Sequence, residues 1–250
     1  MSSSDFDAHV AGAADAVQRA VDALKESQGE SEGNNVEALK QARTFFFSQG
    51  AYAQAAICAM NLGDVYWNQA NAAAARTHYE TAKAEFELAG LNRQVADANM
   101  NLAMVSWGES DMTQARLLYL DALSYYDDNK LSHEVASAKV SLAGVHEALE
   151  EHDLALAAYK DALAYYERED NERRVGQCLL GIGRLLLNEN KFDEAEPYFL
   201  AASHEFRDRR QQHQFAECMV ALADIYHGLG RNDDARKAFE EARKGFAISQ

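Results

Sequence analysis

The sequence predicts an all-α solenoid of stacked antiparallel helix pairs, with about 12 helices in all. A short motif returns every 40 residues without slippage from residue 51 onward. Its five copies are Asn61–Tyr66, Asn101–Ser106, Ser141–His146, Gly181–Leu186 and Ala221–Tyr226. The chain has 1 proline and is 48% hydrophobic with many alanines, which favours helices over sheets and linkers. A fixed period of this size is typical of stacked units that share one core and offer a long concave surface for binding.

Each 40-residue unit is expected to contain two helices joined by a short polar turn. Leu62, Val65 and Tyr66 recur at helical spacing and mark the first helix of the first unit. We expect one continuous domain made of the units 51–90, 91–130, 131–170, 171–210 and 211–250. The second helices should open near residues of good N-cap type, at Thr113, Asp153, Asp193 and Asp233.

Residues 1–50 are expected to form a degenerate N-terminal repeat that caps the solenoid. Leu39, Ala42 and Phe46 match the apolar positions of the second helices 40 residues later. An amphipathic helix is expected from about residue 6 to residue 26, followed by a polar connection at 28–34. Terminal repeats of solenoids are commonly atypical in this way.

The second helices contain the strictest positions of the repeat, and we interpret them as core. One position is alanine throughout, at Ala82, Ala122, Ala162, Ala202 and Ala242. Three residues earlier it is aromatic, at Tyr79, Tyr119, Tyr159, Phe199 and Phe239. The position four residues after the alanine is aromatic as well, at Phe86, Tyr126, Tyr166, Phe206 and Phe246. Small residues let helices approach closely, and aromatic rings fill the space beside them.

Composition and charge narrow the expected partners and location. Lys+Arg 24 against Asp+Glu 40 gives a net charge of −16, which repels nucleic acid and anionic lipid. The same charge attracts basic partners, or it simply keeps the protein soluble. The N-terminus has no signal-peptide pattern and no apolar run is long enough to span a bilayer, so we expect a cytoplasmic protein. Cys58, Cys178 and Cys218 share one repeat position that is alanine elsewhere, which indicates a small apolar slot rather than metal or redox chemistry.

These positions resemble the tetratricopeptide repeat, in the longer-unit class seen in kinesin light chains and bacterial peptide-sensing regulators. In the first copy the family pattern falls on Leu62, Gly63, Tyr66, Ala75, Tyr79 and Ala82. Copies two to four depart from it at the tyrosine position, where they have Ser106, His146 and Leu186. The resemblance covers about 200 residues and implies a right-handed superhelix whose first helices line a concave groove.

The resemblance also implies which residues would face that groove. Asn61 and Asn101 match the asparagine that commonly hydrogen-bonds the backbone of a bound extended peptide in relatives of this family. Trp and Met could supply adaptable apolar contact. The candidate groove residues are Met60, Asn61, Asp64, Trp67, Asp97, Met100, Asn101, Met104, Trp107, Glu147 and Arg184. For Trp67 and Trp107, packing against neighbouring helices is the competing interpretation.

The function that we expect is a non-catalytic scaffold or adaptor that binds a peptide segment of a partner protein. The acidic groove favours a segment with Lys or Arg. No catalytic, nucleotide-binding or metal motif occurs, so we expect no enzyme, no cofactor and no metal. One alternative is self-association through the last repeat, because the chain stops four residues after Phe246 and would leave Phe239 and Phe246 partly uncovered. A third, less favoured, is a regulator of the bacterial peptide-sensing type.

Overall fold

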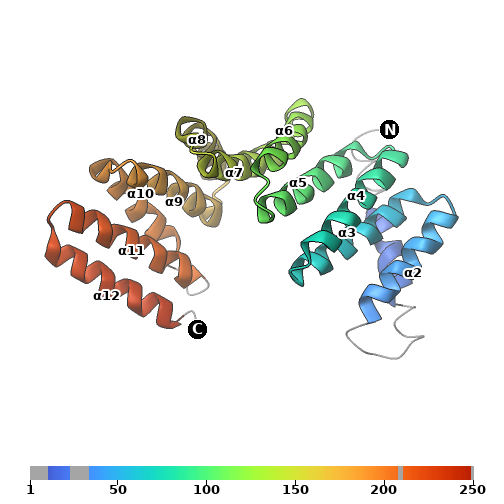
Figure 1. The fold of residues 1–250 in the computed structure, drawn as a ribbon, viewed down its shortest axis with the longest axis horizontal. Coiled ribbons are helices and arrows are strands. Elements are labelled where there is room, and N and C mark those ends of the chain that lie inside the picture. The colour runs from blue at the N-terminus through green and yellow to red at the C-terminus, as the bar shows by residue number, and fades with distance from the viewer. Residues whose placement is uncertain (1–10, 23–33, 208–210, 249–250) are drawn as a thin grey trace. The chain divides into compact units, whose positions relative to one another are not determined.

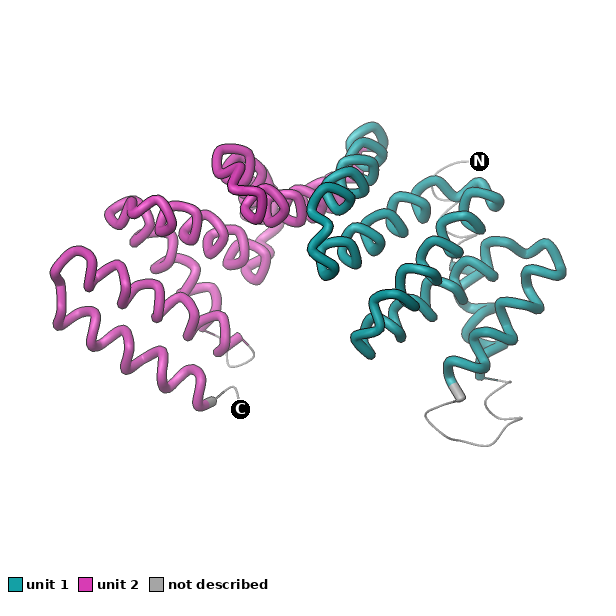
Figure 2. Tube along the Cα trace, viewed as in Figure 1, with its two compact units in different colours: residues 1–129 teal, residues 130–250 magenta. Residues whose placement is uncertain are grey.

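The computed structural model describes residues 11–22, 34–207 and 211–248. In this part of the chain there are twelve helices and no β-strand. The helices fall into two compact units, residues 1–129 and residues 130–250, which Figure 2 colours separately.

Unit 1 contains a helical segment at residues 11–22 and five further helices. These are α2 (Asn34–Ser48), α3 (Tyr52–Asn68), α4 (Ala72–Leu88), α5 (Asn92–Gly108) and α6 (Met112–Asp128). Each helix from α2 to α6 packs on the next one in the chain, as Figure 1 shows. The degenerate repeat is tied to this stack by Arg43 of α2, whose guanidinium pairs with the Glu85 carboxylate of α4. Glu85 is 3% exposed, whereas the Arg43 side chain is partly exposed, so the ion pair is half-buried.

Unit 2 contains six helices within its described residues, again packed in consecutive pairs. These are α7 (Ser132–Ala148), α8 (His152–Arg168), α9 (Glu172–Asn188), α10 (Phe192–Glu205), α11 (Gln212–Gly228) and α12 (Asn232–Ile248). The first helices begin at residues 52, 92, 132, 172 and 212, at intervals of 40 residues.

The tight turns between helices follow a period of 20 residues rather than 40. The second residue after the end of most helices has positive φ, and among the described residues it is glycine only at Gly50, Gly90 and Gly230. The non-glycine residues with positive φ are Ala70, Ser110, Lys130, Glu150, Asp170 and Asn190. At the end of α3, the amide of Asn71 donates to the carbonyl of Tyr66 at 2.9 Å, the hydrogen bond of a Schellman motif. A helix of 17 residues and a three-residue turn therefore form the basic structural step.

The expected N-caps of the second helices were wrong by two residues. The capping residues are Asn71 and Asp111, whose side chains accept from the amides of Ala74 and Gln114. Thr113, Asp153, Asp193 and Asp233 instead lie inside the first turn of their helices. An acidic residue there still stabilises the helix, because it lies near the positive end of the helix dipole.

The alanine positions of all five second helices and the aromatic positions of the first four form the core, as the repeat predicts, whereas Phe239 in the last unit is exposed. Tyr79 and Phe199 are completely buried, and the five alanines from Ala82 to Ala242 are buried as well. Cys58, Cys178 and Cys218 are buried free thiols, and burial raises the pKa of each to about 12. None of the described helices is long and apolar enough to cross a membrane.

Candidate functional site

The α3 and α5 helices of unit 1 place two candidate groove residues from successive repeats in direct contact. The Asn101 side-chain amide donates to the sulfur of Met60, 3.5 Å away. Both side chains are only partly buried, whereas Asn61 is exposed. Met60 also packs against the cluster of Tyr79, Leu102 and Val105, so its inner part belongs to the core. The contact joins a soft apolar group to an amide that can both donate and accept.

A pocket of about 280 Å³ opens beside these residues, at the N-terminal end of unit 1. It is lined by Val17, Gln18, Val21, Asn35, Leu39, Asn61, Asp64 and Val65. Three amides and one carboxylate therefore face a wall of valine and leucine. Gln18 and Asn35 are not among the residues predicted from the sequence, because they belong to the degenerate repeat and have no counterpart in the 40-residue pattern. The one sequence feature that could have indicated them is that they are polar residues close to the apolar positions Val17, Val21 and Leu39.

Two of the acidic candidates in unit 1 accept hydrogen bonds from tyrosines. The Tyr79 hydroxyl donates to Asp64 at 2.7 Å, and the Tyr126 hydroxyl donates to Asp97 at 2.7 Å. Burial, together with the Asp64 carboxylate, raises the pKa of Tyr79 well above its usual value. These carboxylates help to hold the core aromatics, and each oxygen has further lone pairs for other donors. Asp64 is exposed, so it can serve both purposes.

The two tryptophans occupy different environments. Trp67 is half-buried and packs against the cluster of Tyr79, Leu102 and Val105. Its ring also lies over α5, where a Cβ added at Gly108 would be 3.0 Å from the ring. Trp107 is 36% exposed. Met100 and Met104, the remaining candidates on α5, are partly buried.

The other two groove candidates, Glu147 and Arg184, lie in unit 2 and contact each other. Arg184 of α9 pairs with Glu147 of α7 at 3.3 Å, and the hydroxyl of Tyr159 on α8 also donates to Glu147 at 3.3 Å. Burial and the Glu147 carboxylate raise the pKa of Tyr159 to about 12, against the opposing effect of Arg184. The three side chains link three consecutive helices.

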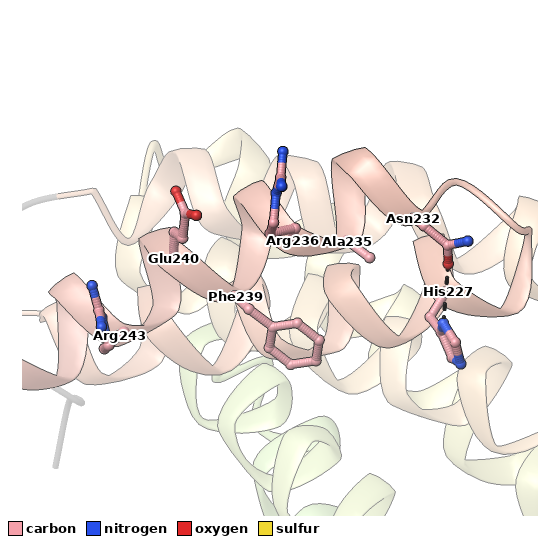
Figure 3. A pocket seen from close by; sticks show the side chains of 7 residues that line it. All are labelled: His227, Asn232, Ala235, Arg236, Phe239, Glu240 and Arg243. Carbon is pink, nitrogen blue, oxygen red and sulfur yellow. Dashed lines mark hydrogen bonds between the residues drawn. The ribbon is translucent and has the colours of Figure 1, made fainter.

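A second pocket, of about 450 Å³, lies at the α11–α12 end of unit 2. Its lining residues, shown in Figure 3, are His227, Asn232, Ala235, Arg236, Phe239, Glu240 and Arg243. Phe239 is 48% exposed, whereas Phe246 is partly buried and makes an edge-to-face contact with His213.

Within residues 11–22, 34–207 and 211–248, no three His, Cys, Asp or Glu side chains come together as metal ligands would. The pocket in unit 1 combines three amides and one carboxylate with apolar residues, and the pocket in unit 2 has Arg236, Glu240 and Arg243 beside Phe239.

Comparisons with protein families identify the repeat. Tetratricopeptide repeat models match residues 134–203 and residues 216–242. The model of the soluble NSF attachment protein family, SNAP, matches residues 2–135, which is more than half of the chain. No curated protein sequence matches the chain at a significant level.

Solved structures share the fold at low identity. BtubC (BKLC) from P. vanneervenii is 19% identical, with a TM-score of 0.71 over 94% of this chain and 92% of that chain. A Rap protein complexed with Competence and Sporulation Factor is 18% identical, with a TM-score of 0.67 over 98% of this chain and 78% of that one. A putative kinesin light chain from Podosopora anserina is 14% identical, with a TM-score of 0.63 over 77% and 95%. At such identities the likeness shows the fold alone.

Proposed function

The chain belongs to the tetratricopeptide repeat family, with residues 2–135 fitting its SNAP-type members, and on that premise we propose that it binds an extended peptide segment of a partner protein. The tetratricopeptide fold generally serves as a non-catalytic scaffold for protein interactions. The proposed binding surface is the α3–α5 face of unit 1 together with the adjoining pocket, and the protein acts as a cytoplasmic adaptor.

The observation that supports this proposal most strongly is the clustering of amides. Gln18, Asn35 and Asn61 line one pocket, and Asn101 follows on the next first helix, against Met60. A side-chain amide can donate to a peptide carbonyl and accept from a peptide N–H, so it recognises backbone whatever the side chains are. Val65, the partly exposed residue of the pocket wall, supplies apolar area for one side chain of the bound segment.

A basic residue in the bound segment fits the charge of this surface. Asp64 lies in the pocket, and the whole chain has a net charge of −16. A Lys or Arg side chain would form a charge-assisted hydrogen bond with Asp64 and would be steered toward an acidic protein. Glu147 and Arg184 already pair with each other in unit 2, so we assign them a smaller part in binding.

A regulator of the peptide-sensing type is a narrower form of the same proposal. The Rap structure with a similar fold contains Competence and Sporulation Factor, so this fold can accommodate such a ligand. We favour the adaptor interpretation, because the amide cluster requires only an extended backbone.

The test is a double substitution of the two exposed or half-exposed asparagines. Peptides selected from a random display library against the whole protein would be titrated against wild type and against Asn61→Ala with Asn101→Ala. Loss of two peptide hydrogen bonds should weaken binding roughly tenfold. Asn92→Ala, an exposed asparagine at the start of α5, is the matched control and should bind normally. Selected peptides that bind the double variant as tightly as wild type would show that this surface is not the binding site.

Self-association through the last repeat is a second candidate function, favoured by the exposure of Phe239. Phe239 is 48% exposed and borders the pocket at the α11–α12 end, so its ring offers apolar area to a second copy. Light scattering over a wide concentration series tests this proposal, and a strict monomer throughout would contradict it.

A further inference from the structure

The aromatic position at Phe239 differs from its equivalents in what covers it. Phe199 is fully buried, and Tyr159 lies so close to α9 that a Cβ at Gly181 would be 2.5 Å from the ring. Tyr79 is likewise packed against Leu102 and Val105 of α5. In each of these cases another helix lies over the aromatic ring. No described residue covers the Phe239 ring in this way, so one more helix could pack over the ring at this position.

The outer face of α12 has an unusual charge order for such an acidic protein. Asp233, Arg236, Glu240 and Arg243 alternate in sign along the helix and sum to zero. Glu240 and Arg243 form no ion pair with the described residues. Arg236 lies 3.7 Å from Asp233, one turn earlier on the same helix, and these two side chains are 72% and 90% exposed, so this pair is a weak one that a second copy can replace. Figure 3 shows the Phe239 ring on one side of α12 and Arg236, Glu240 and Arg243 along the adjoining side. This surface lacks the net negative charge that would keep two copies apart.

The order of charges on α12 is complementary to the same order read in the opposite direction, as on an antiparallel second copy of the helix. Positions 233 and 243 are equally far from position 238, and so are positions 236 and 240. If two α12 helices lie antiparallel, with the twofold axis crossing them at the height of position 238, each acid lies at the height of an arginine of the other copy. Arg236 then lies opposite the partner copy's Glu240, and Asp233 lies opposite the partner copy's Arg243. The two Phe239 residues would be offset by only about 3 Å along the helix axis, at a rise of 1.5 Å per residue.

We propose that α12 is the dimer interface of this protein, and that two copies meet through antiparallel α12 helices. One flank of the interface consists of the two Phe239 rings, and the other consists of two reciprocal Arg236–Glu240 pairs. Such a twofold contact is isologous and closes on itself, so it gives a dimer rather than a fibre. The inference rests on the self-association proposed above and adds its residues, its direction and its register.

A second copy fits this surface better than a partner of one charge sign. A basic helix would meet Arg236 and Arg243, and an acidic helix would meet Asp233 and Glu240. An identical helix in the reversed direction satisfies all four, with an apolar contact at Phe239. Because the charged pairs lie at the rim of a small interface, the dimer should be weak and should dissociate further in high salt.

Charge reversal and charge exchange on α12 test this register. Sedimentation equilibrium of the full chain would give the dimer dissociation constant for wild type, Arg236→Glu, Glu240→Arg and the double variant. Each single change creates two like-charge contacts and should weaken the dimer at least tenfold. The double variant restores both opposite-charge contacts and should dimerise as wild type does, within about threefold. Both positions are exposed on a helix, so unchanged thermal unfolding of dilute monomer would confirm that the variants fold.

The outcomes separate this inference from the proposal on which it rests. A dimer that weakens in both single variants and recovers in the double variant supports the antiparallel α12 register. A dimer insensitive to all three overturns the register but leaves self-association standing. A double variant that dimerises as weakly as the single variants also overturns the register, since positions 236 and 240 would then not face each other. A strict monomer at every concentration overturns both, even if a helix from another protein binds near Phe239.

Discussion

The Tyr79 hydroxyl donates a 2.7 Å hydrogen bond to the Asp64 carboxylate, and this bond holds the tyrosine ring directly over Gly63. A Cβ added at Gly63 would lie 2.4 Å from the ring. The core packing of the first repeat and the charge of its candidate binding pocket therefore depend on the same pair of residues.

We expect Gly63→Ala to lower the free energy of unfolding by roughly 1–3 kcal/mol, because the added methyl group displaces the anchored ring. The second repeat tolerates Ala103 at this position, but it has Met104 where the first repeat has Asp64. In a double-mutant cycle measured by urea unfolding, Asp64→Met should therefore remove part of the cost of Gly63→Ala. Strictly additive changes would show that the hydrogen bond does not hold the ring in place.

The left-handed turn residues predict a stabilising substitution. Ala70, in the turn after α3, has a φ of 57°, a conformation that costs a residue with a side chain about 1 kcal/mol. Ala70→Gly should raise the melting temperature. Ala84→Gly makes the same chemical change at an exposed position inside α4. It should lower the melting temperature, and its cost in free energy of unfolding should be similar in size to the gain from Ala70→Gly. Equal effects of the two changes would contradict the conformational explanation.

The fold could be predicted from the sequence because the buried core positions recur in every repeat. The helix caps and the pocket residues were predicted less well, because they do not recur. The buried positions of Ala82, Tyr79 and Cys58 recur every 40 residues, so periodicity alone identifies them. The helix starts were misassigned because Asp153 and its equivalents are good caps in isolation, whereas the turn geometry places the cap two residues earlier. Gln18 and Asn35 reach the pocket only through the tertiary packing of the degenerate repeat, which no local pattern encodes.

The three buried cysteines predict a loss of stability at alkaline pH. Burial raises the pKa of Cys58, Cys178 and Cys218 to about 12, above the unfolded value of about 8.5. The folded state thus keeps protons that the unfolded state releases, so stability is intact below the unfolded pKa and falls as the pH rises from about 8.5 to 12. The slope should reach about 1.4 kcal/mol per pH unit for each cysteine.

Replacing the cysteines with alanine provides the control for this pH dependence. Ala98 and Ala138 occupy the same position in the other repeats, so the slot accepts alanine. The triple variant should lose most of the alkaline slope in urea unfolding measured at several pH values. An unchanged slope would assign the effect to other groups, such as Tyr159, whose pKa burial also raises to about 12.

Removing the charge of Asp64 should separate recognition of peptide backbone from recognition of a basic side chain. Asp64→Asn keeps an oxygen that can accept from the Tyr79 hydroxyl, so the fold should be retained. Affinity for a selected peptide containing Lys should fall roughly three- to tenfold, and its dependence on salt should become shallower. The same peptide with Lys replaced by norleucine should bind both proteins equally, because only the backbone contacts to Asn61 and Asn101 remain. If the Lys peptide binds Asp64→Asn as tightly as wild type, its charge is recognised elsewhere or not at all.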